Sequence, residues 1–201
     1  MKKLLQLIPA VALLVMACSC DSKSKLANDI NGTWASSPDR LADNNGSSAS
    51  IIRIIEFDKV PDQSGGSLIM SGLISVNSAV PQGQGIDMPI SYTASGVATI
   101  TGQWSVIDDD EIALVLDGST LKVDVDPQGI VLDYNVLSGT SAPDTTAIKP
   151  ALAEMVRKVI TNGVETRFFN ANKIDDIKIN NNMMSCEIDD QDITMRRQNV
   201  E

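Results

Sequence analysis

Histidine is absent from the 201 residues of this chain. Its absence excludes Ser-His-Asp and Cys-His catalysis and removes the commonest side-chain metal ligand. Cysteine is scarce as well: Cys18, Cys20 and Cys186 are too few for a disulfide framework. Cys186 lies in a strand-like run and is expected to be a small buried side chain; a reactive thiol and a Cys20–Cys186 bridge are the alternatives. No catalytic, cofactor-binding or metal-binding residue is predicted, and we expect no enzyme activity.

Aromatic and basic residues are also few. Only seven aromatic side chains are present, and several are needed for the core, which argues against an exposed glycan-stacking platform. Sixteen basic residues against 26 acidic ones give the chain a net charge of −10. A protein of this charge repels phosphate backbones, so nucleic acid is not an expected partner.

The first 17 residues have the layout of a secretory signal peptide. Lys2 and Lys3 open the segment, and an apolar stretch covers residues 4–17. That stretch is 14 residues long, whereas a membrane-spanning helix needs about 20. We therefore expect residues 1–17 to be removed. The remaining 184 residues carry a net charge of −12, and their number suits a single domain.

The junction Val15-Met16-Ala17-Cys18 resembles the lipobox of bacterial lipoproteins. In that pattern a branched aliphatic residue stands three places before the cysteine, and a small residue stands just before it. The resemblance implies that Cys18 receives lipid and becomes the new N-terminus. Cys20, preceded by Ser19, is the poorer alternative. The three acyl chains that the resemblance implies would anchor the protein stably to a membrane.

A second motif indicates the group of bacteria from which the chain is expected to come. Asp144-Thr145-Thr146 resembles a short O-glycosylation signal of Bacteroides-type bacteria, although a helix N-cap is favoured for the same residues. The resemblances imply a Bacteroidales-type lipoprotein of the cell envelope, anchored through Cys18 to the outer membrane on its periplasmic or surface-exposed face. Residues 18–30 are then a lipidated polar tether, and residues 31–201 form one β domain.

From residue 32 onward the sequence predicts short strands separated by turn residues. Ser95-Gly96 and Asp117-Gly118 have the composition of tight turns between strands. The predicted strands are residues 33–36, 51–57, 67–77, 89–94, 97–107, 111–116, 120–125, 130–136, 164–170, 174–179, 183–188 and 192–197.

One helix interrupts this series of strands late in the chain. Asn162-Gly163 is expected to end it, because glycine favours the conformation that follows a helix C-terminus. The apolar residues that recur at helical spacing are Ile148, Leu152, Met155, Val156, Val159 and Ile160.

The order of these elements predicts a mainly β fold, an antiparallel meander barrel with one late α-helix. A two-sheet β-sandwich is the alternative. The sequence Asn31-Gly32-Thr33-Trp34 resembles the Gly-x-Trp start of lipocalins and of bacterial lipocalin-like lipoproteins. This resemblance implies a lipocalin-like (calycin) barrel in which Gly32 and Trp34 plug one end.

Two acidic motifs contain carboxylates of the kind that bind calcium. Residues 124–129 begin like an EF-hand loop, but the fifth position is Gln128 and the twelfth is Asn135, so a β-turn is favoured. Residues 108–111 contain four successive carboxylates. Neighbours in one turn rarely converge on one ion, so a solvated turn is favoured there as well.

Two functions remain for the tethered domain. The first is a lipocalin-like carrier or sensor that holds a small apolar ligand in its barrel. The second is an interaction module with a filled barrel and no ligand, which binds another protein of the envelope by its surface. The state of the barrel interior, open or filled, distinguishes them.

Overall fold

The computed structural model describes residues 22–44, 47–79, 90–134, 148–168 and 171–198. Within these ranges the chain is mainly β, with one helix over residues 22–30 and a second, α2 (Ile148–Phe168). The strands are β1 (Gly32–Ser36), β2 (Asp39–Asn44), β3 (Ser47–Lys59), β4 (Gly65–Ala79), β5 (Ile90–Val106), β6 (Ile112–Val125), β7 (Val131–Tyr134), β8 (Lys173–Asn180), β9 (Met183–Ile188) and β10 (Gln191–Gln198).

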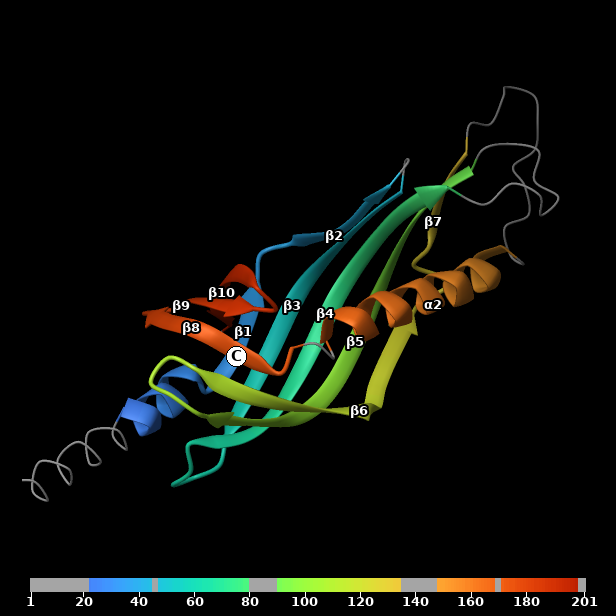
Figure 1. The fold of residues 1–201 in the computed structure, drawn as a ribbon. Helices are drawn as coiled ribbons and strands as arrows, with labels where there is room; N and C mark the ends of the chain where they lie inside the picture. The colour runs from blue at the N-terminus through green and yellow to red at the C-terminus, as the bar shows by residue number, and fades with distance from the viewer. Residues whose placement is uncertain (1–21, 45–46, 80–89, 135–147, 169–170, 199–201) are drawn as a thin grey trace, which may run out of the picture.

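Eight of these strands close into a ring of hydrogen bonds. The order β1-β10-β9-β8-β6-β5-β4-β3 returns to β1, because β1 pairs with both β10 and β3. All pairs are antiparallel, while β2 and β7 extend the sheet beyond the ring from β3 and β5. Figure 1 shows the long strands β3–β6 running on past the short strands β8–β10. The predicted antiparallel meander barrel is confirmed, and the sandwich alternative is wrong.

Apolar and polar side chains alternate along the long strands, and this alternation decides which face of the sheet is buried. In β5 the even-numbered positions from Ile90 to Val106 face inward and the odd-numbered positions face solvent, as the period of two in a strand requires. The register carries this pattern across the sheet: Ile55 pairs with Met70, and Met70 pairs with Ile100. All three side chains are at most 2% exposed.

Large side chains fill the interior of the ring. They form one continuous cluster with the rest of the core. Among those exposed by 5% or less are Trp34, Ile55, Phe57, Leu68, Met70, Ile100, Trp104, Ile112, Leu114, Ile174, Met184 and Met195. Each buried aliphatic or aromatic side chain contributes roughly 1.5–3 kcal/mol to folding, so this filling is the main stabilisation of the barrel.

One seam of the ring is short. Strands β6 and β8 pair only at Ile112–Ile174 and Ala113–Lys173, whereas β4 and β5 pair along fifteen residues. Two further backbone bonds support the seam: the amide of Leu114 donates to Asn172 O, and that of Ile177 donates to Asp110 O. The seam is therefore the narrowest connection in the closed sheet.

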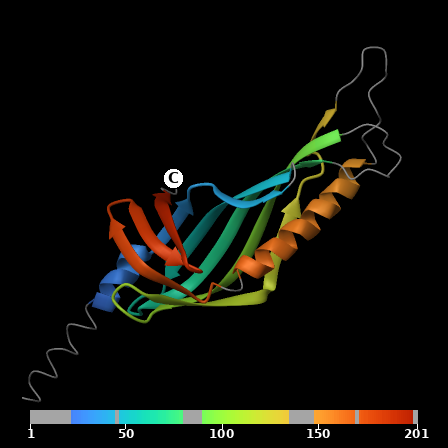
Figure 2. The same ribbon diagram turned by 45° about the horizontal axis from the view of Figure 1, so that its top comes forward.

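The helix over residues 22–30 lies against one end of the barrel (Figure 2). The sequence assigned these residues to the lipidated polar tether, residues 18–30. Instead Leu26, Ala27 and Ile30 are buried in the core. Their spacing of one, three and four residues places them on one helical face, so this part of the chain packs as a structural element.

The helix α2 lies on the inner face of the long strands, against β5 and β6 (Figures 1 and 2). A Cβ added to Gly96, an inward position of β5, would lie only 2.5 Å from Cδ1 of Ile160. The helix residues exposed by 4% or less are Leu152, Ala153, Val156, Ile160 and Val164. Of the predicted stripe, Val159 is 56% exposed and faces away from the sheet.

The predicted end of this helix at Asn162-Gly163 is wrong, as is the strand over residues 164–170. The helix continues to Phe168. Val164 stands four residues after Ile160 and is buried beside it, so the apolar stripe carries the helix past the glycine. Gly163 itself lies on the exposed side, and a Cβ added to it would meet no atom outside the local helix backbone within 4 Å.

Three further predictions about strands are corrected. Ser95-Gly96 is not a turn, because β5 pairs with β4 without interruption through both residues. Asp117-Gly118 is not a turn between strands either; it lies within β6, next to a shift in register against β5. Residues 39–44, which lie between the predicted strands 33–36 and 51–57, form β2, which pairs with β3. Within the described residues, no helix combines the length and apolarity needed to cross a membrane.

Candidate functional site

Gly32 and Trp34, the two predicted plug residues, lie at the barrel end that carries the first helix. Trp34 is completely buried, and its indole N–H donates to Ile30 O at 2.7 Å. Gly32 has a φ of +114°, which side-chain-bearing residues rarely adopt. A Cβ on Gly32 would also approach Nη1 of Arg197 to 3.0 Å. The two residues therefore have distinct structural tasks, while their role as a plug stays a prediction.

Arg197 completes this end of the barrel and was not singled out by the sequence. Its guanidinium carbon lies 4.3 Å from the centre of the Trp34 ring. The same group donates hydrogen bonds to Asp29 O and Asn31 O, at the C-terminal end of the first helix. A cation at this position satisfies carbonyls that have no partner within the helix and complements the helix dipole. Arg197 thus ties β10 to both the helix and β1.

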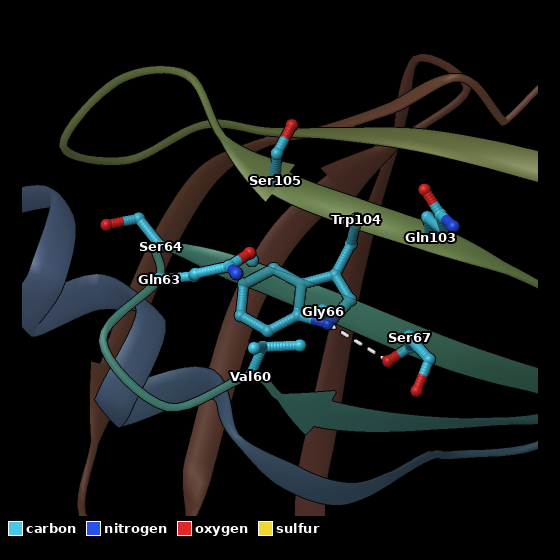
Figure 3. Close-up of a pocket in the computed structure, with 9 residues that line it drawn as sticks. Val60, Gln63, Ser64, Gly66, Ser67, Gln103, Trp104 and Ser105 are labelled. Carbon is cyan, nitrogen blue, oxygen red and sulfur yellow. Dashed lines mark hydrogen bonds between the residues drawn. The ribbon is translucent and has the colours of Figure 1, made fainter.

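A hollow of roughly 530 Å³ opens beside Trp104 at the turn between β3 and β4. Val60 and Gln63 lie next to the indole ring, whereas Gln103 and Ser105 point away from it (Figure 3). The indole is only 3% exposed, and its N–H donates to Ser67 O at 3.0 Å. Its ring contacts Phe57 edge to face, with centroids 5.4 Å apart. Trp104 is therefore committed to the core and offers no stacking surface to a ligand.

The carboxylates at the turn between β5 and β6 lie next to the short seam between β6 and β8. Burial and the neighbouring Asp175 carboxyl raise the pKa of Glu111 above its usual value. Lys173 forms an ion pair with Asp175, and this contact raises the pKa of the lysine. Oδ1 of Asp175 is buried and has no hydrogen-bond partner within the described residues. Glu111 directly precedes β6 and Asp175 lies in β8, at the narrow junction of these strands, so their charges bear on its stability.

Acidic and cysteine side chains do not gather into a metal site in the described part of the chain. There, no group of three or more Cys, Asp or Glu side chains is arranged to hold an ion. The EF-hand-like segment 124–129 forms the β-turn that the sequence favoured: Gly129 N donates to Asp126 O, and Gln128 N donates to Asp126 Oδ1. Hydrogen bonds within the turn therefore engage both the carbonyl and the carboxylate of Asp126.

Cys186 is a free thiol on the inner face of β9. It is 4% exposed, and burial raises its pKa to about 12. A thiol that remains protonated at neutral pH is a poor nucleophile, so Cys186 acts as a small core side chain. Cys18, Cys20 and the segment 144–146 lie outside the described residues.

The cation of Arg53 is the feature of the interior that sequence analysis missed. Within the described residues it is the one charged side chain among the buried residues, at 7% exposure. Nη2 of Arg53 lies 3.3 Å from Oδ2 of Asp39. Both residues line a second hollow, of roughly 320 Å³, between the β1–β2 connection and the start of β10. The signal in the sequence was a single charge at an inward position of the apolar run 51–55.

A third hollow, of roughly 550 Å³, lies at the turn between β8 and β9. Asn181 in this turn has a φ of 53°, a conformation that asparagine tolerates well. The hollow is bounded by the turn and by Arg196 and Arg197. Arg197 already binds the first helix, so this hollow is explained by the packing of the barrel end.

Of the three hollows, the one at Arg53 alone combines a buried charge with a polar lining of hydroxyl and amide groups. That combination is typical of a site that orients a polar ligand. Comparison with known proteins adds no family: no family model matches the chain, and no curated protein sequence is significantly similar to it.

Proposed function

We propose that this chain is a lipid-anchored protein of the bacterial cell envelope, with a lipocalin-like barrel that recognises another envelope protein by its surface. The observation that supports recognition by the surface is the filled interior. Large side chains occupy the ring, and α2 occupies the inner face of the long strands beyond it. In this proposal the domain has no catalytic role.

The anchor in this proposal is the acylated Cys18. The supporting observations are the signal-like residues 1–17 and the lipobox-like junction that ends in this cysteine. The first helix begins by residue 22 and packs on the barrel end, so the tether would be only a few residues long. The domain would therefore be held close to the outer membrane, on its periplasmic or surface-exposed face.

The outer face of β4 and β5 is the surface we assign to the partner. Ile69, Leu73 and Val97 are each 41–42% exposed there, and Leu73 pairs directly with Val97 across the two strands. The solvent face of an antiparallel sheet is usually polar, and clustered exposed aliphatic residues are typical of protein contact sites.

Photo-crosslinking in cells tests this assignment in the full-length lipoprotein. A photoreactive amino acid at Leu73 should give a discrete adduct, whereas the same group at the exposed Lys178 of β8 should give none. Val97→Asp should abolish the Leu73 adduct without lowering the melting temperature, because Val97 is a surface residue. Equal adducts at Leu73 and Lys178, or an adduct that survives Val97→Asp, would refute the assigned surface.

The anchor has a separate test. Labelled palmitate should enter the wild-type chain, and Cys18→Ser should lose the label and accumulate the uncleaved precursor. Cys20→Ser is the matched control and should keep both the label and the processing. A label that survives Cys18→Ser but is lost in Cys20→Ser would show that Cys20, and not Cys18, carries the lipid.

One observation favours the alternative function, a lipocalin-like carrier of a small apolar ligand. The strand residues beneath α2 are small, among them Ala94, Gly96 and Ala98, and the buried face of the helix that covers them is apolar. Displacement of the helix would leave an apolar groove. A fluorescent fatty-acid probe that binds the wild-type protein, and is released by Val156→Asp without a fall in melting temperature, would support the carrier over the interaction module.

A further inference from the structure

Arg53 is a charged side chain on a face of β3 that is otherwise apolar. Its inward neighbours on the same strand are Ile51 and Ile55, both at most 2% exposed. Across the sheet it is in register with Gly72, and Gly72 is in register with Ala98. Burial of a charge is costly unless the charge is paired, so a guanidinium at this position requires an anionic partner.

The backbone around Arg53 holds the guanidinium at the hollow. The amide of Arg53 donates to Oγ of Ser36 at 2.9 Å, and the same hydroxyl donates to Ser37 O at 2.8 Å. Ser36 ends β1 and Ser37 begins the connection to β2, and together they form one wall, while residues 191–194 at the start of β10 form the other. The cation is therefore positioned by β1 and β3 and reached between the β1–β2 connection and the start of β10.

The carboxylate now beside Arg53 is replaceable. Asp39 lies 3.3 Å from the guanidinium, but its own side chain is 42% exposed. It can turn into water without leaving a buried charge of its own, whereas Arg53 cannot. An incoming carboxylate would reproduce the contact that Asp39 makes, and planar guanidinium groups bind carboxylates well.

We propose that this hollow binds a small polar monocarboxylate, which takes the place of Asp39 on the guanidinium of Arg53. The volume, roughly 320 Å³, is at the lower end of the range for small-molecule sites. Hydroxyl and amide groups of Ser37, Gln191 and Thr194 line it and suit a ligand with hydroxyl groups. Arg40 and Asp192 are also in the lining, so the formal charges of the site balance and a polyanion would be repelled by the two aspartates.

The test uses glucuronate and its neutral amide, glucuronamide, with the full chain purified from membranes or from the soluble fraction, wherever it is found. Asp39→Asn removes the carboxylate that lies 3.3 Å from the guanidinium of Arg53 and should lower the melting temperature. Glucuronate should restore that temperature, because a ligand that binds only the folded state stabilises it, and glucuronamide should not. By calorimetry, Asp39→Asn should bind glucuronate about tenfold more tightly than the wild type, because the carboxylate of Asp39 no longer competes with the ligand for a charged hydrogen bond to Arg53.

Two controls keep the result specific. Asp189→Asn removes a carboxylate from the β9–β10 turn, near the hollow but outside its lining, at a φ of 55° that asparagine accepts; it should leave glucuronate affinity unchanged. In Arg53→Gln, glucuronate should bind at least tenfold more weakly than in the wild type.

Equal effects of glucuronate and glucuronamide on Asp39→Asn, or no effect of either, would overturn the proposal. That failure is distinct from failure of the proposed function. The crosslinking pattern at Leu73 concerns the outer face of β4 and β5 and does not depend on this hollow.

Discussion

The contact between Gly96 and Ile160 offers a direct test of how α2 is seated on the sheet. In Gly96→Ala the new Cβ would lie 2.5 Å from Cδ1 of Ile160, and 3.1 Å from both Asp124 O and Cγ2 of Val125. The first distance is far below normal contact, so the helix or the strand must shift. Overpacking of this kind costs about 1–3 kcal/mol of unfolding free energy.

The clash should be relieved by a second substitution. Ile160→Val deletes Cδ1, the atom that the new methyl group meets first. Alone, this change should cost about 0.5–1.5 kcal/mol, as Ile→Val does in other cores. In the double variant the methyl group occupies the space that Cδ1 has left. The double variant should therefore be more stable, by about 1 kcal/mol, than the sum of the two single effects predicts.

Urea denaturation of the wild type, the two single variants and the double variant measures this coupling. The matched control replaces Ile160→Val with Ile188→Val, on β9, which should combine additively with Gly96→Ala. Sites without contact add within about 0.3–0.5 kcal/mol. Additivity of the Gly96 and Ile160 changes within that limit would show that α2 does not lie over Gly96, and the description of the filled inner face would be wrong.

Three further predictions concern other parts of the fold. Gly163→Ala should raise the unfolding free energy by about 0.8–1 kcal/mol, because alanine is the better residue inside a helix; a loss of stability would mean that the helix ends at this glycine. The raised pKa of Glu111 means that the folded state holds this proton more tightly than the unfolded chain, so stability should fall as pH rises above 4.5. Glu111→Gln should flatten that fall in urea midpoints measured between pH 4 and pH 8, and an unchanged slope would contradict the assignment. Arg197→Met removes two charged hydrogen bonds and the contact with Trp34, and should cost about 2–4 kcal/mol in a urea melt; Arg196→Gln, its exposed neighbour, should cost under about 0.5 kcal/mol.

Local chemistry was enough to predict the late hairpins. The turns at residues 180–182 and 189–190 consist of asparagine and aspartate, which tolerate positive φ. The structure has positive φ at Asn181, Asp189 and Asp190, and β8, β9 and β10 follow one another as predicted. Where one short segment decides the structure, composition is sufficient.

Local chemistry misled where contacts with distant strands decide the structure. Ser95-Gly96 has the composition of a turn, but pairing with β4 on one side and β6 on the other keeps β5 extended at Gly96. Its missing side chain serves the close approach of α2. In the same way Asn162-Gly163 resembles a helix end, yet burial of Val164 on the sheet side continues the helix.

The polar residues of the candidate sites could not be paired from the sequence. Arg197 binds carbonyl groups 166 and 168 residues before it, and no local pattern signals such a contact. Arg53 was visible as a charge in an apolar strand, but its partner Asp39 lies in β2, a strand that the sequence did not indicate. Closure of the barrel brings these groups together.

Native mass spectrometry of the full protein, released from membranes in mild detergent, tests the filled barrel and the lipid anchor together. We expect one species, a chain that begins at Cys18 and carries covalent acyl groups, with no further mass bound non-covalently in the barrel. A non-covalent apolar adduct that dissociates on gentle activation would contradict the filled interior and indicate a carrier.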